Sequence, residues 1–441
     1  MIPATRSHSP EAILQVTNAL RSMLRKINSA VFLFSMLLAF TLASAQNPSC
    51  NWPCYHGPDR TNQSADTGLP KTWPEEGPPL LWKATGLGKG YSTVSFDNGF
   101  IFTSGMIDSV TYVIALDMEG NIVWKAPNGT SWQTELPWAR TYDGARSTPT
   151  CDSGMVYHLG ELGRLAALDQ QTGDEQWSLE LRDRFNAAIP EYGYAESVFI
   201  EGTRLYCCPA GKEAYIVCLD KRDGSLIWKN NEIQGDVGFS SLIRYNMDGI
   251  PMLTGLSSNH IFSVNAETGS LLWTYPFENS RSNNIPDPIF EGGNLFASSG
   301  YGKGSILLNI AVTGEEVNVK RIWQNDLLDN LLGGVILYKG FLYGSGDQSR
   351  GWFCIDFKSG NPLWKSGGKG SITFADGMLY CLDERGTMTL VNANPNAYYP
   401  AGSFRIPEGG RGMFWAHPVV CNHKLYVRHD DFLYVYDLDG F

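Results

Sequence analysis

The sequence predicts an all-β protein, an eight-bladed β-propeller whose blades are four-stranded antiparallel sheets. Three observations support this prediction: a repeat that ends in tryptophan, short β-rich runs upstream of most repeat ends, and no sustained helical period after residue 45. The six intervals between the repeat tryptophans from Trp82 to Trp364 average 47 residues. Tandem four-stranded units of this length are typical of propellers.

Each repeat ends in an Asp or Asn, then a Gly after two or three intervening residues, and then a Trp. The clear copies are ALDMEGNIVW, ALDQQTGDEQW, CLDKRDGSLIW, SVNAETGSLLW and CIDFKSGNPLW, and NIAVTGEEVNVKRIW is a looser one. We expect the Gly to supply a positive-φ turn position, the Asp to cap that turn, and the Trp to fill space between adjacent blades. The signature therefore predicts architecture and not chemistry.

Short runs rich in Val, Ile, Phe and Tyr precede most signatures and predict the inner strands of each blade. First strands are expected to begin near Thr93, Thr148, Ser197, Ser241, Asp287, Gly334, Ser371 and His417. The seventh unit lacks the signature, and the eighth stops at LYVYDLDGF without a fourth strand, whereas PPLLWKA at 78–84 is a fourth strand without the first three. We therefore expect 78–84 to complete the last blade and close the ring, which removes open sheet edges.

The N-terminal region predicts export. An apolar run from Val31 to Leu42 follows basic residues and ends in Ala-Ser-Ala. Its twelve residues span roughly 18 Å as a helix, short of the ~30 Å of a membrane core. We expect residues 1–45 to be an N-terminal extension and signal peptide, with Met23 as an alternative start, 46–77 an N-terminal segment, and 78–441 the propeller. The predicted location is periplasmic or secreted, with association with the outer membrane left open.

The composition narrows the classes of partner that the protein could bind. The formal net charge is −11 and the sequence pI is about 5.2, which leaves no basic stripe to neutralise phosphates and excludes a nucleic-acid partner. We expect a monomer that does not span the membrane. Its expected partner is an envelope protein, a glycan or a small molecule.

Ligands of propellers normally meet the innermost strands at one mouth of the central channel. Aligning the eight first-strand entries leaves mostly small residues, and the exceptions are charged or aromatic. The candidate ligand-binding residues of the channel mouth are Tyr91, Arg146, Tyr194, Glu196, Asp287, Lys369, Trp415 and His417. Convergent charges and aromatic walls suit a small-molecule or sugar site. The structural alternative is an ion pair between Arg146 and Glu196 and a His417 bound to backbone; the connection 131–147 either caps the mouth or packs as a surface loop.

Several segments resemble the PQQ-like β-propeller repeat family of the quinoprotein alcohol dehydrogenase-like superfamily, which includes BamB-like and polyvinyl-alcohol-dehydrogenase-like bacterial proteins. They include WPCYHGPDR (52–60), GYAES (193–197), PAGKEAYIVCLD (209–220) and WAHPVV (415–420). In that subfamily the sixth blade is usually entered through Asn-His-His-Gly-Gly, whereas here Leu331 and Leu332 replace the histidines. Any chemistry that those histidines perform in relatives is lost in this chain.

The resemblance implies two functions. The favoured one is an exported binding or scaffold module with its ligand at the channel mouth. The alternative is a periplasmic PQQ-dependent dehydrogenase that oxidises alcohols or sugars, which requires Ca²⁺ held by hard oxygen ligands. Glu196, Asp287 and Arg146 supply only fragments of that set, and no Cys-x-x-Cys-His haem motif is present. No catalytic residue, metal ligand or cofactor is assigned from the sequence.

The nine cysteines include a vicinal pair in RLYCCPAGKEAY. Large PQQ dehydrogenases carry a disulfide between adjacent cysteines, so the resemblance implies one between Cys207 and Cys208. Neighbouring Cα atoms are ~3.8 Å apart, closer than in ordinary disulfides, and side chains of successive strand residues point to opposite faces. Three states remain open: a vicinal disulfide, a bridge from one of the pair to Cys218, or reduced and buried thiols.

Overall fold

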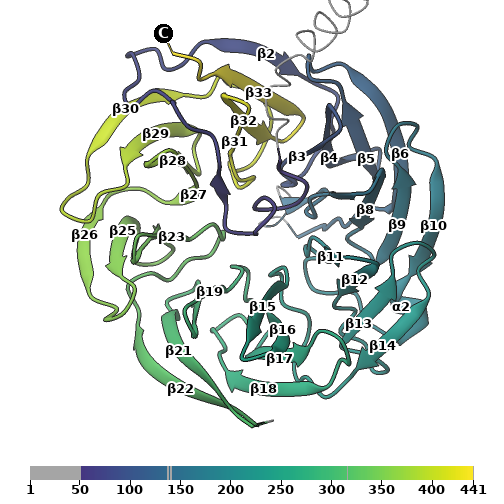
Figure 1. The fold of residues 1–441 in the computed structure, drawn as a ribbon. Helices are drawn as coiled ribbons and strands as arrows, with labels where there is room; N and C mark the ends of the chain where they lie inside the picture. The colour runs from purple at the N-terminus through teal and green to yellow at the C-terminus, as the bar shows by residue number, and fades with distance from the viewer. Residues whose placement is uncertain (1–50, 137–138, 140–141, 315, 441) are drawn as a thin grey trace, which may run out of the picture. The chain divides into compact units, whose positions relative to one another are not determined.

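The computed structural model describes residues 51–136, 139, 142–314 and 316–440. They lie in one compact unit that begins at Cys50, and the expected signal peptide and Met23 lie outside the described residues. Within this unit eight antiparallel sheets surround a central axis (Figure 1). The predicted eight-bladed propeller is confirmed.

Blades 1–7 each consist of four consecutive strands that run from the channel to the rim. Blade 1 contains β3 (Ser95–Asp97), β4 (Phe100–Ile107), β5 (Val110–Leu116) and β6 (Ile122–Thr130), and blade 2 contains β7 (Thr150–Asp152), β8 (Met155–Leu159), β9 (Arg164–Asp169) and β10 (Glu175–Glu180). Blade 3 contains β11 (Phe199–Glu201), β12 (Arg204–Cys207), β13 (Ile216–Asp220) and β14 (Leu226–Asn230), and blade 4 contains β15 (Ile243–Met247), β16 (Ile250–Leu256), β17 (His260–Asn265) and β18 (Leu271–Pro276). Blade 5 contains β19 (Ile289–Glu291), β20 (Asn294–Ser299), β21 (Gly304–Thr313) and β22 (Glu316–Asn325), and blade 6 contains β23 (Ile336–Tyr338), β24 (Phe341–Gly346), β25 (Gly351–Asp356) and β26 (Pro362–Ser366). Blade 7 contains β27 (Gly370–Ala375), β28 (Met378–Asp383), β29 (Thr387–Asn392) and β30 (Pro400–Arg405).

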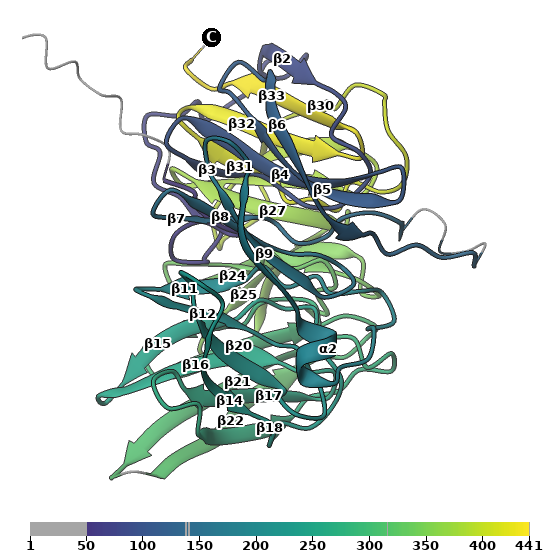
Figure 2. The ribbon, with the colours of Figure 1, turned by 90° about the vertical axis from the view of Figure 1, so that its right-hand side faces the viewer.

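Blade 8 joins the two ends of the propeller. Its inner strands are β31 (Val419–Cys421), β32 (Lys424–His429) and β33 (Phe432–Asp437), and β2 (Leu80–Ala84) is its outer strand. Trp82 of β2 lies opposite Val435 of β33 in an antiparallel pair, and Figure 2 shows this blade in purple and yellow. The predicted closure by the N-terminal strand is confirmed.

The repeat signature packs one blade against the next, and five of its tryptophans also form a hydrogen bond across that contact. The Trp124 indole Nε1 donates to the Gln170 carbonyl oxygen at 3.1 Å, and a Cβ added at Gly173, whose φ is +76°, would lie 2.7 Å from that indole. The Asp169 carboxylate accepts the backbone N–H of Thr172 at 2.9 Å. Equivalent indole bonds are made by Trp177, Trp228, Trp323 and Trp364. The architectural interpretation of all three signature positions is confirmed.

A second set of hydrogen bonds joins neighbouring blades beside the channel. The backbone N–H of Thr93 donates to Thr148 Oγ1, Thr148 N–H to Ser197 Oγ, Ser197 N–H to Ser241 Oγ, and Ser241 N–H to an oxygen of Asp287, at 2.6–3.2 Å. Each of these backbone N–H groups is therefore bonded to the neighbouring blade. The first strands therefore begin about two residues later than the sequence predicts in most blades.

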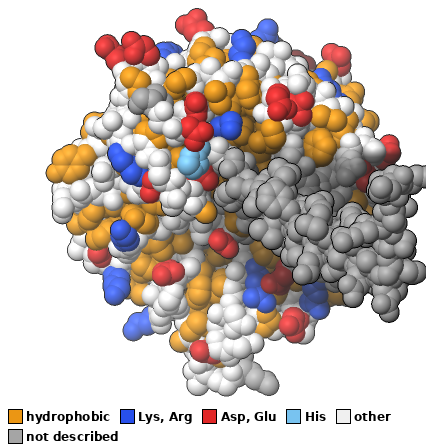
Figure 3. All heavy atoms as spheres, turned by 45° about the horizontal axis from the view of Figure 1, so that its top comes forward, with side chains coloured by type: hydrophobic (Ala, Val, Ile, Leu, Met, Phe, Trp, Pro, Cys, Tyr) orange, Lys and Arg blue, Asp and Glu red, His pale blue; other side chains and the backbone are white. Residues whose placement is uncertain are grey.

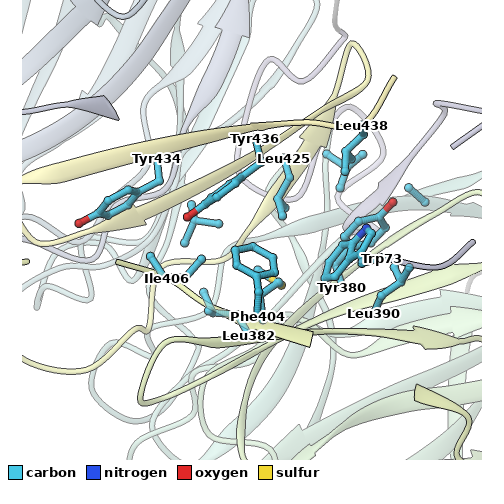
Figure 4. Packing of buried hydrophobic residues seen from close by; sticks show 14 of the residues in the cluster. Trp73, Tyr380, Leu382, Leu390, Phe404, Ile406, Leu425, Tyr434, Tyr436 and Leu438 are labelled. Carbon is cyan, nitrogen blue, oxygen red and sulfur yellow. The ribbon is translucent and has the colours of Figure 1, made fainter. Parts of the chain in front are cut away.

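Hydrophobic side chains fill the wedges between blades. Figure 4 shows the wedge between blades 7 and 8, where Phe404 contacts Trp73 and Tyr436 with ring centroids 5.4 and 4.9 Å apart. Trp73 N–H also donates to the Ala401 carbonyl at 3.0 Å, so the segment before β2 belongs to this core. The described part of the chain has one α-helix, α2 (Leu181–Phe185), and no described helix is long and apolar enough to cross a membrane.

Candidate functional site

The first aligned position of each blade lies where the chain enters the innermost strand. The eight residues are all half-exposed, and we call them the mouth ring: Tyr91, Arg146, Ala195, Phe239, Ile285, Leu332, Lys369 and Trp415. The next two positions of each blade hold either a glycine or a residue whose side chain is buried. The structure therefore places four predicted site residues in the ring and three, Glu196, Asp287 and His417, beneath it.

Aromatic side chains form one sector of the mouth ring. The Trp415 ring lies between Tyr91 and Tyr142, with centroid distances of 5.1 and 5.2 Å. Its indole Nε1 donates to Glu384 Oε1 at 2.8 Å. Burial is the main cause that raises the pKa of Tyr91, and the charge of the nearby Arg146 opposes it. The Tyr91 phenol therefore stays neutral over the ordinary pH range.

A charged sector adjoins the aromatic one. Lys369 Nζ lies 2.6 Å from Asp347 Oδ1 and 3.3 Å from Glu384 Oε1. Burial opposes the charge of Lys369, but the two carboxylates raise the pKa of this amine. The lysine is thus held as a cation between two blades.

Arg146 is held by its own loop and not by Glu196. Its guanidinium donates to the carbonyl oxygens of Gly144 at 2.8 Å and Tyr142 at 2.6 Å, and lies 4.8 Å from the Trp132 ring centroid. One oxygen of Glu196 accepts a backbone N–H elsewhere, and the other has no hydrogen-bond partner among the described residues. The expected ion pair between Arg146 and Glu196 is therefore wrong. Residues 137, 138, 140 and 141 of this connection lie outside the described residues.

Tyr194 does not line the mouth. Its side chain is fully buried in the core between blades 2 and 3, and its hydroxyl donates to the Pro209 carbonyl at 2.7 Å. The residue after it, Ala195, occupies the half-exposed ring position. Successive residues of an extended chain point in opposite directions, so placing Ala195 at the mouth turns the Tyr194 ring into the core.

The N-terminal segment 52–62 enters the channel beneath the mouth ring, as the purple chain near the centre of Figure 1 shows. His56 Nε2 lies 2.8 Å from His417 Nδ1, and His56 Nδ1 lies 3.3 Å from Asp287 Oδ2. The Tyr55 hydroxyl lies 3.3 Å from His417 Nε2. The side chains of His56 and Asp287 are 4% and 5% exposed, so this chain of polar groups is closed off from solvent.

The hydrogen-bond pattern assigns the protons of this chain. His417 Nε2 lies 2.8 Å from the Leu332 carbonyl oxygen, which only accepts, so this nitrogen carries a proton. Burial, and then the nearby His56, lower the pKa of His417 to about 3; the ring is neutral and its Nδ1 accepts. His56 Nε2 therefore donates to His417 Nδ1. The other ring nitrogen of His56, Nδ1, lies 3.3 Å from Asp287 Oδ2.

The blade 6 entry accommodates His417. The Leu332 carbonyl accepts its Nε2 proton, so the backbone-bound alternative for His417 is confirmed. A Cβ added at Gly334, where φ is +76°, would lie 2.8 Å from His417 Cε1. The glycine is thus required twice, by its backbone conformation and by the close approach of the imidazole.

Glu196 is a buried carboxyl group with few polar partners to offset its loss of hydration. It is 1% exposed, and Oε2 accepts the Cys208 N–H at 2.9 Å. Burial is the main cause that raises its pKa to about 8, opposed by the Cys208 hydrogen bond and the Arg60 charge. Arg60, from the N-terminal segment, donates to the carbonyls of Ser197 at 3.0 Å and Val198 at 2.6 Å.

The paired cysteines are free, buried thiols, as is Cys218. Cys207 packs between blades 2 and 3, whereas Cys208 and Cys218 pack between blades 3 and 4, because successive side chains lie on opposite faces of the blade. Cys218 lies opposite Tyr206 and not opposite Cys208, which places Cys208 at a diagonal position. The structure thus shows the third of the three open states and neither disulfide.

The residues at the mouth do not fit a PQQ–Ca²⁺ centre. Ca²⁺ takes about six to eight oxygen ligands, but the carboxylates beside the mouth ring, Asp347 and Glu384, both bind Lys369. In the described part of the chain, no group of three or more His, Cys, Asp or Glu side chains is arranged to hold a metal ion. We therefore derive no reaction step through PQQ.

Sequence reasoning missed the N-terminal segment as part of the channel. Tyr55 and His56 lie within WPCYHGPDR, which stands out as a motif, but no repeat period relates it to the blades. Asp347 and Glu384 were missed because they follow second strands, outside the aligned entries.

Charged side chains of both signs are interspersed with apolar ones on the face in Figure 3. The eight-bladed fold and its tryptophan-ended repeats define the class of PQQ-like β-propellers. The chain belongs to the family described as outer membrane protein assembly factor BamB, whose model matches residues 109–366.

Two curated proteins and two solved structures illustrate the relationship. The chain is 25% identical over 150 residues to outer membrane protein assembly factor BamB of Nitrosomonas eutropha and 24% identical over 159 residues to quinoprotein alcohol dehydrogenase PedH of Pseudomonas putida. These matches span 34% and 32% of this chain but only 32% and 25% of the relatives. BamB from Moraxella catarrhalis shares 14% identity with a TM-score of 0.58, covering 81% of this chain and 99% of that one. Quinohemoprotein alcohol dehydrogenase from Comamonas testosteroni shares 12% with a TM-score of 0.61, covering 91% and 82%. The structural likeness shows the fold alone.

Proposed function

We propose that this protein is an exported propeller that binds an envelope protein, a glycan or a small molecule at the mouth ring and acts as a binding or scaffold module. The observation that carries the proposal is a half-exposed ring of aromatic and charged residues above a floor closed by the N-terminal segment. A rigid concave surface with a few convergent polar groups is a common form of binding site.

Binding is favoured over catalysis because most acid and base groups at and beneath the mouth have partners, and Glu196, which has an oxygen without one among the described residues, is 1% exposed. His417 is neutral and donates to a carbonyl, Asp287 accepts the Ser241 N–H and lies 3.3 Å from His56 Nδ1, and Glu384 binds both Trp415 and Lys369. The name of one relative, an outer membrane protein assembly factor, supports a scaffold. The similarity to a quinoprotein alcohol dehydrogenase supports the alternative of a PQQ-dependent dehydrogenase.

Binding at the ring is tested with Trp415→Ala and Arg146→Ala. Wild type and variants are immobilised and probed with a glycan array and with envelope extract quantified by mass spectrometry. Loss of one aromatic or arginine contact at the centre of a site weakens binding by about 2 kcal/mol, or roughly 30-fold. Lys320→Ala on the exposed strand β22 is the control and should bind as wild type does. Equal capture by all four proteins would contradict the mouth site.

The enzymatic alternative is tested by titrating PQQ with Ca²⁺. We expect no change in the PQQ absorbance at micromolar cofactor and no dye-linked alcohol oxidation. Saturable PQQ binding together with oxidation would replace the binding module by the dehydrogenase.

Export is tested by sequencing the N-terminus of the mature protein after cell fractionation. We expect a start at Gln46 in the envelope or secreted fraction. An uncleaved chain confined to the cytoplasm would contradict this part of the proposal.

A further inference from the structure

The N-terminal segment pairs with the inner edges of some blades and leaves others open. In a hairpin, the middle residue of a three-residue innermost strand directs its N–H and C=O away from its own blade. Three such N–H groups donate to carbonyls of the N-terminal segment: Phe96 to Trp52 at 2.8 Å, Cys151 to Pro53 at 2.7 Å, and, in the longer β27, Phe374 to Asn62 at 3.1 Å. Beyond Asn62 the chain continues as β1 (Gln63–Ser64), which pairs in parallel with β27.

Blade 5 has the same geometry without a partner. Phe290 is the middle residue of β19 and lies opposite Leu295, as Phe96 lies opposite Ile101 in blade 1. Its N–H and C=O therefore also point toward the channel, but no hydrogen bond from another described segment reaches them. In Figure 1 the purple segment near the centre lies close to β27 and β31.

A groove lies along this open edge, and we call it the blade 5 groove. It has a volume of about 570 Å³ and is lined by the N-terminal segment, β15, β19 and the turns of blade 6. The rings of Tyr245 and Phe290 stack at 3.7 Å and form an apolar wall. The turn residues Gly292 and Lys339 in its lining follow the innermost strands, whereas the mouth ring precedes them, so the groove and the ring lie at opposite ends of these strands.

The charges of the groove differ from those of the whole chain. Its lining contains four basic residues, Arg60, Arg244, Lys339 and Lys358, and two acidic ones, Asp59 and Glu291, in a chain of net charge −11. Lys339 and Lys358 are exposed, and Lys358 has no ion-pair partner within the described ranges.

We propose that the blade 5 groove binds an extended acidic peptide segment of a partner protein, which adds a strand to the open edge of β19. The backbone of the peptide would bond to Phe290 as the N-terminal segment bonds to Phe96, Cys151 and Phe374. Its apolar side chains would contact the Tyr245–Phe290 wall, and its carboxylates would face Lys339 and Lys358. Main-chain pairing supplies affinity in this mode of recognition, and alternate side chains supply specificity. This inference does not depend on the mouth ring.

The probe is a fluorescein-labelled hexapeptide of alternating valine and glutamate with blocked ends, followed by fluorescence anisotropy on the whole protein. We expect saturable binding below 1 mM. A valine–lysine hexapeptide, and the Lys339→Glu/Lys358→Glu double variant, should each weaken binding by about tenfold, since two exposed ion pairs contribute roughly 1.4 kcal/mol together. Lys320→Glu on β22 reverses an exposed charge outside the groove and should leave binding unchanged.

Strand addition is tested separately with two probes N-methylated at odd or at even residues. Only one edge of the peptide faces β19, so one probe should lose binding and the other retain it. The proposal is overturned by no binding up to 1 mM, by equal binding of both N-methylated probes, or by indifference to the double lysine variant. A dimer in sedimentation that the double lysine variant abolishes would assign the groove to a second copy and also overturn it.

Discussion

Glu196→Gln should change how the stability of this protein depends on pH. The carboxyl is 1% exposed and its pKa is raised from 4.5 to about 8, mainly by burial. The folded state therefore holds a proton that the unfolded state has released between these two pH values. Stability contributed by this group is fully present below pH 4.5 and is lost as the pH rises to about 8.

The magnitude follows from the difference between the two pKa values. Each pH unit in this window costs about 1.4 kcal/mol, so wild type should lose roughly 4 kcal/mol relative to Glu196→Gln between pH 5 and pH 8. Glutamine has nearly the same shape, retains an oxygen for the Cys208 N–H, and does not ionise. The expected result is a wild type that is destabilised with rising pH and a variant that lacks this slope.

Urea unfolding at pH 5, 6, 7 and 8, followed by tryptophan fluorescence, measures both proteins. Buried His158 and His417 have pKa values lowered to about 4 and about 3, so their contribution to stability falls below about pH 6.5, but it cancels in the difference between wild type and variant. Parallel stability curves over this range would refute the assignment of Glu196 as a neutral buried acid.

Three further predictions concern the channel and the thiols. Asp287→Asn should lower the free energy of unfolding in urea by about 1–3 kcal/mol because it removes the buried carboxylate that accepts the Ser241 N–H at 2.6 Å and lies 3.3 Å from His56 Nδ1, and a double-mutant cycle with His56→Gln should show a coupling of about 0.5 kcal/mol or more; additive losses would contradict the contact between the two side chains. Gly334→Ala should lower the thermal midpoint more than the control Gly340→Ala, because both have positive φ but only the first Cβ meets His417 at 2.8 Å; equal shifts would contradict the close contact. The seven free thiols are buried and should react with a thiol reagent only on unfolding, and mass spectrometry of the unreduced protein should find no vicinal disulfide.

The blade architecture could be predicted because its determinants are local and periodic. Trp124 and Gly173 belong to successive copies of one signature, so their contact across blades repeats with the sequence period. The closing strand could be predicted because residues 78–84 form a fourth strand without the first three strands of a blade, and the last unit has three strands without a fourth. The exact start of each innermost strand could not be predicted, since the N–H groups of Thr93 and Ser197 donate to residues of the neighbouring blade that lie 55 and 44 residues further along the chain.

The sequence by itself determined the number of blades and the way the ring closes, because regular hydrophobic and turn patterns encode them. Only the tertiary structure decided which chemistry lies beneath the mouth. His56 and His417 are 361 residues apart, and nothing in the repeat relates a segment outside the blades to the floor of the channel. Burial then neutralises His417 and raises the pKa of Glu196 to about 8, and burial depends on how the whole ring closes around that segment.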